Sequence, residues 1–262
     1  MRADGSHARR LTARNQDFNP AWSPDGSKIL FHRFVQGEHV DLFVMNARGK
    51  HMTRLTSAPN LDGFGAWSPD GSRIAYTRNF RRDGGHTSQI FVMDADGGNV
   101  EQLTNSSYSS GFPTWSPSGR RIAFTSGREC ESRQQRRCGT ALYVMKAAGS
   151  ARHRIGPFNR TAHVQYPAWS PNGRWIAYDR AGDCCASTGI YLVRPSGAKH
   201  HRITNNVAGH PSWSPDGRWL AVDFRPEAQK SDIWAISRDG DNLRRITRAP
   251  AFESTPSWSG VR

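Results

Sequence analysis

The chain has 262 residues and a formal net charge of +14 at pH 7, with 36 lysines and arginines against 22 acidic residues. Its hydrophobic fraction is 36%, its mean hydropathy is −0.71, and it has no run of about 18 apolar residues, which excludes a membrane-spanning helix. Nine Trp, twelve Phe and six Tyr residues compensate for the lean apolar content, because each buried ring removes a large area from water.

A short motif recurs along the chain and organises it. The motif reads Trp-Ser-Pro-Asp-Gly at Trp22, Trp67 and Trp213, with Ser or Asn in place of Asp after Trp115 and Trp169, and a stump begins at Trp258. These tryptophans are 45, 48, 54, 44 and 45 residues apart. Self-similarity at this period indicates an array of supersecondary units, and a four-stranded propeller blade fits the length.

Each repeat predicts four short strands. The first ends at the motif Trp, and Ser-Pro-Asp-Gly predicts a tight hairpin, because Pro fixes φ and Gly takes the left-handed position. In the second strand Ile29 and Phe31 point to one face and Leu30 to the other, and residues 42–45 form an apolar third strand. Apolar residues on both faces predict sheets packed between neighbours. A polar fourth strand with one apolar anchor, such as Arg54-Leu55-Thr56, is typical of an outer edge.

These patterns predict a single all-β domain, a six-bladed β-propeller of antiparallel blades whose sixth blade is incomplete. Five whole blades are expected at about 13–56, 57–104, 105–156, 157–204 and 205–247, with a partial closing blade from 1–12 and 248–262. Residues 1–12 align with residues 93–104, and 254–258 read as a first strand, so the two middle strands of the sixth blade are missing. Two explanations stay open: a thin two-stranded closure, or the loss of residues upstream and downstream through a mis-called start or an excised fragment, which we favour because Met1 aligns with a Met of the repeat. The first places the protein in the cytoplasm, and the second favours the periplasm or the cell exterior.

The repeat units resemble a known family. Pro-x-Trp-Ser-Pro-Asp-Gly-x-x-Ile-Ala-Phe/Tyr, Ile-Tyr-Val-Met-x-x-Asp-Gly and Arg-x-Leu-Thr resemble the TolB-type, WD-like propeller repeat over nearly the whole chain. That family includes the periplasmic TolB protein, which binds the peptidoglycan-associated lipoprotein, and the propellers of prolyl-oligopeptidase-type peptidases and certain pectin-degrading lyases. The resemblance implies a scaffold for protein–protein interaction. The alternative is the propeller of a larger serine peptidase or glycan-processing enzyme without its catalytic domain.

Catalytic motifs are absent from the sequence. The 262 residues contain no Gly-x-Ser-x-Gly nucleophile elbow and no His-Glu-x-x-His zinc motif. We therefore expect no catalytic residues, no metal site and no cofactor.

Four cysteines fall in two neighbouring loops between second and third strands. Cys130 and Cys138 flank a basic insertion, and Cys184 and Cys185 lie in the corresponding loop of the next repeat. Their spacing matches no standard zinc knuckle. We expect disulfides that staple these loops, with free thiols and a metal site as the alternatives.

The best binding candidates are positions that vary inside the otherwise regular repeat, just before each first strand. Variation on a fixed scaffold is where specificity can be encoded. We expect a channel mouth formed by Asp17, Asn19, Asp62, Phe64, Ser110, Phe112, Tyr166, His210 and Glu253. Around it we expect a basic rim of Arg78, Arg81, Arg82, Arg128, Arg133, Arg136 and Arg137.

An acidic, aromatic mouth inside a basic rim favours a protein partner, one that is acidic or associated with the cell envelope. The positive charge alone would also suit nucleic acid. We do not expect that partner, because arginines are scattered through every repeat rather than gathered in one block. We expect a monomer.

Overall fold

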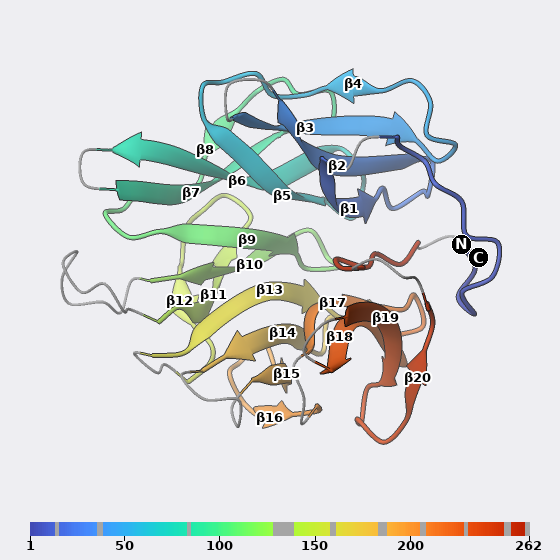
Figure 1. Ribbon diagram of the computed structural model, residues 1–262. Coiled ribbons are helices and arrows are strands. Elements are labelled where there is room, and N and C mark those ends of the chain that lie inside the picture. Colours follow the sequence, from blue (N-terminus) through green and yellow to red (C-terminus); the bar gives the residue numbers. More distant parts are fainter. Residues whose placement is uncertain are drawn as a thin grey trace.

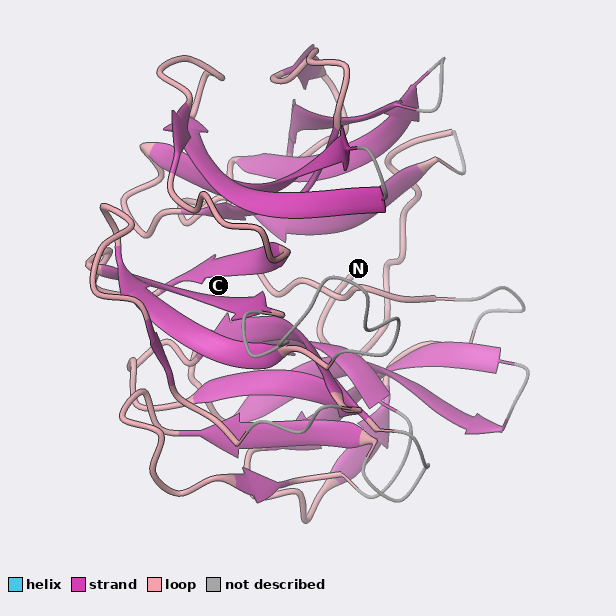
Figure 2. Ribbon diagram, turned by 90° about the vertical axis from the view of Figure 1, so that its left-hand side faces the viewer, coloured by secondary structure: helices cyan, strands magenta, loops and turns pink. Residues whose placement is uncertain are grey.

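The structure is a computed structural model that describes residues 1–13, 16–35, 39–82, 85–127, 139–157, 161–182, 188–204, 208–227, 230–248 and 253–259. These residues contain twenty β-strands and no helix (Figures 1 and 2). The predicted all-β class is therefore confirmed. The cysteines at 130, 138, 184 and 185, and the arginines at 128, 133, 136 and 137, lie outside the described residues.

The strands form five antiparallel units of four, as the repeat predicts. The first comprises β1 (Asp17–Trp22), β2 (Lys28–Val35), β3 (His39–Asn46) and β4 (Thr53–Arg54). The second comprises β5 (Leu61–Trp67), β6 (Arg73–Arg82), β7 (Gly85–Asp94) and β8 (Glu101–Gln102). One parallel pairing, Val40 with Leu61, joins these two units into one eight-stranded sheet.

The other three units are separate four-stranded sheets. The third comprises β9 (Ser110–Trp115), β10 (Arg121–Ser126), β11 (Ala141–Lys146) and β12 (His153–Arg154). The fourth comprises β13 (His163–Trp169), β14 (Ile176–Ala181), β15 (Gly189–Val193) and β16 (His201–Arg202). The fifth comprises β17 (Ala208–Trp213), β18 (Trp219–Glu227), β19 (Lys230–Ser237) and β20 (Leu243–Arg245). We refer to the five units as blades 1 to 5.

The Ser-Pro-Asp-Gly hairpin forms as its residue types require. In blade 1 the Gly26 N–H donates to Ser23 O at 2.9 Å, and Gly26 has a φ of 67°. Asp25 accepts from the Ser23 hydroxyl at 2.6 Å and from the Ser27 N–H at 3.1 Å. These hydrogen bonds lower the pKa of Asp25 to about 2, so the side chain of the turn is fully ionised at neutral pH.

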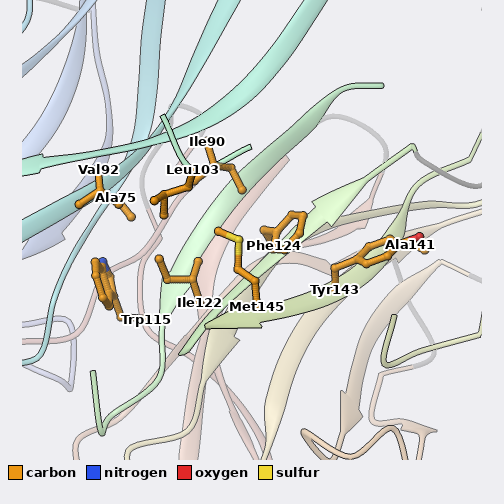
Figure 3. Close-up of a cluster of buried hydrophobic side chains, with 10 residues drawn as sticks. All are labelled: Ala75, Ile90, Val92, Leu103, Trp115, Ile122, Phe124, Ala141, Tyr143 and Met145. Atoms are coloured by element: carbon orange, nitrogen blue, oxygen red, sulfur yellow. The ribbon is translucent and has the colours of Figure 1, made fainter. Parts of the chain in front are cut away.

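Each interface between blades joins a face of small and branched residues to a face of large ones. Between blades 2 and 3, Ala75, Ile90, Val92 and Leu103 pack against a larger set (Figure 3). That set consists of Trp115, Ile122, Phe124, Ala141, Tyr143 and Met145. The same pairing recurs between blades 1 and 2, 3 and 4, and 4 and 5. The alternation predicted for the second strand is therefore correct, and both faces of the inner blades are buried.

The fourth strands are shorter than their sequence pattern predicts, because a threonine hydroxyl replaces strand pairing at their ends. Thr56 Oγ1 accepts the N–H of Leu42 at 3.0 Å, and Thr104 Oγ1 accepts that of Ile90 at 2.8 Å. The residue before each of these threonines contacts a turn of the next blade. An added Cβ on Gly97, for example, would lie 2.8 Å from Leu55 O.

The two ends of the described chain lie where a sixth blade belongs. An added Cβ on Gly5 would meet Ile246 of blade 5, and one on Gly49 of blade 1 would meet Leu11. The segment 253–259 lies between β17 and β1, because the Trp258 N–H donates to Ser212 Oγ at 3.2 Å and the Trp22 N–H to Ser257 Oγ at 3.4 Å (Figure 1). Residues 1–12 thus take the place of an outer strand and 253–259 that of an inner strand, although neither segment is a regular strand.

Candidate functional site

A β-bulge interrupts the inner strand of every blade three residues before the motif Trp. The pairing of β1 with β2 shifts between Phe18 and Ala21, and the other four inner strands shift at the same place. At each bulge one residue is left-handed, with φ between 48° and 54°, and residue 255 of the terminal segment shares this geometry. The six residues are Asn19, Phe64, Phe112, Tyr166, His210 and Thr255. Phe, Tyr and Thr rarely adopt this conformation, so the surrounding structure must impose it at those positions.

The bulges bring four of these side chains together, although they come from four different blades. The ring of Phe112 lies 4.5 Å, centroid to centroid, from those of both Phe64 and Tyr166, and Tyr166 lies 3.9 Å from His210. Phe64 and Tyr166 are themselves 5.9 Å apart. We call Phe64, Phe112, Tyr166 and His210 the aromatic ring. All four remain half-buried and keep accessible surface.

In blades 1, 2 and 4, a polar side chain ten residues after the motif Trp supports the bulge of the next blade. The Phe64 N–H donates to Nδ1 of His32 at 3.4 Å, and the Phe112 N–H donates to Thr77 Oγ1 at 3.0 Å. The N–H of His210 interacts in the same way with the carboxylate of Asp179. These bonds cross from one blade to the next, so the repeat positions the aromatic ring from its own second strands.

Two of these supporting groups are electrostatically unusual. Burial lowers the pKa of His32 to about 4, against the opposing effect of Asp17. The imidazole is therefore neutral at physiological pH, as an acceptor of the Phe64 N–H must be.

Burial raises the pKa of Asp179 to about 7, with His210 opposing the shift and Asp223 adding to it. Its Oδ1 is inaccessible to solvent and has no hydrogen-bond partner among the described residues. His210 Nδ1 lies 2.7 Å from Asp223 Oδ1, so this histidine stands between two carboxylates. Burial also raises the pKa of the adjacent Tyr166 phenol, which stays protonated. The aromatic ring thus has an acidic side at blades 4 and 5.

The acidic residues predicted at the mouth are bound within the fold. Asp62 has a side-chain exposure of 0% and holds Arg78 through two hydrogen bonds of 2.8 Å. Asp17 pairs with Arg33 in the same way, at 2.5 and 2.9 Å. In blade 3, a buried hydrogen bond of 3.2 Å from Ser110 to Ser126 takes the place of the ion pair. These residues link the first two strands, whereas the four side chains of the ring stay half-buried, as do Asn19 and Glu253.

The remaining predicted residues are dispersed. Glu253 donates its N–H to Ser231 O at 2.9 Å and lies beside the gap between blades 5 and 1. Arg81 and Arg82 belong to β6, which places them at the end of blade 2 next to the second-to-third-strand loop. Arg78 has a side-chain exposure of only 14%, so it faces Asp62 rather than solvent.

Sequence reasoning did not single out His32, Asp179 or Asp223 as part of the site. A signal was present, since all three occur ten residues after a motif Trp, where blades 2 and 3 have Thr77 and Thr125. Among the described residues, no group of three His, Cys, Asp or Glu side chains is arranged to hold a metal ion. In the same part of the chain, no helix is long and apolar enough to cross a membrane.

The architecture matches that of a known protein family. Residues 4–138 match the family model of the TolB beta propeller domain. The chain belongs to the TolB beta propeller family. A search of curated proteins found no match.

Solved structures with the same fold include TolB from Acinetobacter baumannii, with a TM-score of 0.82 and 20% identity over 97% of this chain. The chain spans 60% of that protein's length. A TolB-type protein from Agrobacterium tumefaciens has a TM-score of 0.72 and 21% identity, covering 91% of this chain and 83% of that one. An oligogalacturonate lyase from Vibrio parahaemolyticus has a TM-score of 0.54 and 13% identity, covering 90% and 80%. At these identities the similarity establishes the fold alone.

Proposed function

We propose that this TolB-like propeller is a non-enzymatic scaffold that binds a protein partner at the aromatic ring in its channel mouth. The observation that carries the proposal is the contrast between backbone and side chain at the six left-handed positions. Their backbone repeats within a few degrees, while the side chains change from Asn to Phe, Tyr, His and Thr. Turn and packing requirements account for the backbone, and a ligand accounts for the side chains.

The chemistry of the ring suits a protein segment. Aromatic side chains on a rigid support supply large contact areas with little loss of conformational entropy, and such residues dominate interface energetics. Phe64 and Phe112 are each held by a hydrogen bond from their own N–H, which preorganises this part of the ring. The basic loops predicted around the mouth would steer an acidic partner and set its association rate.

The lyase-like alternative is weaker on electrostatic grounds. A uronate is an anion, whereas the polar groups beside the ring are the carboxylates of Asp179 and Asp223. A carboxylate that is ionised at this position repels a uronate. As the propeller of a larger serine peptidase, the chain would depend on catalytic residues supplied by another domain.

The test is a quantitative pull-down from a cell-envelope extract with three immobilised baits. The baits are the wild type, the ring variant Phe112→Ala/Tyr166→Ala, and the surface control Val100→Arg, whose parent side chain is 47% exposed and distant in the fold. We expect at least one protein to bind to the wild type and the control and to be reduced at least about tenfold on the ring variant. Its association rate should fall as salt rises. Equal capture by all three baits would contradict the proposal.

A further inference from the structure

Blades 4 and 5 place a carboxylate where blade 2 needs only a hydroxyl. In blade 2, Thr77 Oγ1 accepts the Phe112 N–H at 3.0 Å, and this bond is enough to hold the bulge. The equivalent residues of blades 4 and 5, ten positions after the motif Trp, are Asp179 and Asp223. Burying a carboxylate costs far more free energy than burying a hydroxyl. Support of the backbone therefore does not explain the negative charge at these two positions.

The two carboxylates converge on one side of the aromatic ring. A Cβ added to Gly209 would lie 3.1 Å from Asp179 Oδ2 and 3.4 Å from Asp223 Oδ1. Gly209 directly precedes His210, whose Nδ1 lies 2.7 Å from Asp223 Oδ1. After burial, the negative charges of Asp179 and Asp223 are what raise the pKa of the Tyr166 phenol. Both carboxylates thus act on the side of the ring that Tyr166 and His210 form.

Asp179 differs from the carboxylates of blades 1 and 2 in its lack of a paired cation. Asp17 and Asp62 each hold an arginine through two hydrogen bonds. Asp179 Oδ1, in contrast, is inaccessible to solvent and has no hydrogen-bond partner among the described residues. His210, the group that most opposes the rise of its pKa, is already bonded to Asp223. A positive charge from outside the described residues would therefore stabilise the ionised form of Asp179.

The side chains around Asp179 suit an organic cation better than a metal ion. In the part of the chain that the structure describes, no three His, Cys, Asp or Glu side chains are arranged to hold a metal. The surface beside the carboxylates is aromatic instead, since Phe64, Phe112 and Tyr166 are half-buried and keep accessible surface. Aromatic faces attract ammonium and guanidinium groups, and they do so more strongly where water is excluded.

We propose that the aromatic ring binds a positively charged side chain of the protein partner, a lysine or an arginine, beside the carboxylates of Asp179 and Asp223. This inference rests on the proposed function, since it names the group through which the partner contacts the ring. The apolar stem of such a side chain packs on the aromatic rings while its charged end reaches the carboxylates. The basic rim predicted around the mouth acts on the net charge of the whole partner, whereas the ring selects one residue of it.

The test titrates synthetic peptides into the purified chain. The peptides share the sequence Ac-Gly-Ala-Xaa-Ala-Gly-NH2, with lysine, arginine or the neutral norleucine at the central position. NMR of the chain with 13C-labelled Phe and Tyr measures the Kd and shows whether Phe112 and Tyr166 respond. We expect the lysine and arginine peptides to perturb these two rings, and the norleucine peptide to bind at least about tenfold more weakly.

The variant Asp179→Asn removes the charge and keeps an oxygen that can accept the His210 N–H. We expect it to weaken binding of the lysine and arginine peptides at least about tenfold and to leave the norleucine peptide unchanged. It should also raise the Tm at pH 8, because it removes an ionised carboxylate that lacks a paired cation, whereas loss of a purely structural carboxylate would lower the Tm. The control Asp96→Asn makes the same change at an exposed turn of blade 2 and should alter neither quantity.

The affinity for the lysine peptide should also rise with pH. Burial raises the pKa of Asp179 to about 7, with His210 opposing the shift and Asp223 adding to it, so this carboxyl is mostly neutral at pH 5.5 and mostly ionised at pH 8. The Tyr166 phenol stays protonated over this range. The Kd of the wild type should therefore fall at least about fivefold between pH 5.5 and pH 8. It should change less in Asp179→Asn, where His210 is the group that still titrates.

The inference is overturned if the lysine peptide does not bind, if the norleucine peptide binds equally well, or if Asp179→Asn leaves the Kd unchanged. These outcomes are distinct from those of the pull-down. A protein that is captured by the wild type and lost on Phe112→Ala/Tyr166→Ala supports the scaffold function even where the lysine peptide fails. Capture of no such protein contradicts the scaffold function, while binding of the lysine peptide would still identify the cation site.

Discussion

His32 illustrates how a single residue adapts a repeated position to its surroundings. At the equivalent site in blade 2, the Thr77 hydroxyl accepts the Phe112 N–H of the next blade, whereas in blade 3 the Thr125 hydroxyl donates to Gly111 O of its own blade. Blade 1 uses a buried imidazole that must stay neutral to accept the Phe64 N–H. The same hydrogen bond is therefore pH-sensitive in blade 1 and pH-insensitive in blade 2.

We predict that His32→Thr removes an acid-dependent loss of stability. Unfolded His32 takes up a proton near its ordinary pKa of 6.5, whereas the folded protein resists protonation until about pH 4. The wild type should thus lose stability as pH falls from 6.5 to 4, by on the order of 3 kcal/mol from this group. Urea unfolding at pH 7.5, 6, 5 and 4 measures the slope. The variant should show a flatter slope, and the exposed control His163→Thr should keep that of the wild type. A slope equal to the wild type in His32→Thr would refute the assignment.

At the scale of elements, the ion pairs at the mouth are part of the strand register. Asp62 pairs with Arg78 and Asp17 with Arg33, each at the matched position of an antiparallel pair, and Ser110 faces Ser126 at the same position. These contacts fix the ends of the first two strands next to the bulge. A carboxylate with no exposed surface can neither meet a partner nor remain without its arginine.

We predict that Asp62→Ser destabilises the fold by about 3–5 kcal/mol, because Arg78 would be left buried and unpaired. The double variant Asp62→Ser/Arg78→Ser reproduces the Ser110–Ser126 contact of blade 3 and should recover at least about 2 kcal/mol of that loss. Denaturant unfolding of the two variants measures the coupling. The exposed pair Arg73–Glu101 is the matched control, and Glu101→Ser should cost less than about 1 kcal/mol. If Asp62→Ser cost no more than the control, the Asp62–Arg78 ion pair would contribute little to the stability of the fold. Both side chains would then be available to a binding partner.

The hairpins, the ion pairs and the bulges show why some features could be predicted from the sequence and others could not. Strands and turns follow from local rules, since Pro24 and Gly26 set one hairpin and Ile29 with Leu30 set the two faces. The Asp62–Arg78 pair could also have been found, because a hairpin of known turn fixes which residues face each other. The left-handed bulge could not, because Phe64 and Thr255 have no local preference for positive φ. Only the convergence of blades around an axis imposes it.

For the whole molecule, the incomplete sixth blade makes the five blades unequal. Blades 2, 3 and 4 are packed on both faces. Blades 1 and 5 each have one face packed on a neighbouring blade and one face that lines a cavity of about 1230 Å³ between these two blades. Stability in a repeat protein is close to a sum of blade terms and nearest-neighbour interface terms, so an end blade lacks one interface.

We therefore predict that local stability differs from blade to blade around the propeller, which native-state hydrogen exchange can measure. Amides of β2, β3, β18 and β19 should open at lower free energy than those of β6, β7, β10 and β11, because fewer buried contacts hold them. The difference should amount to about 1–3 kcal/mol, the order of one or two buried apolar side chains. Uniform protection in all five blades would mean that residues 1–12 and 253–259 already supply a complete interface between blades 5 and 1.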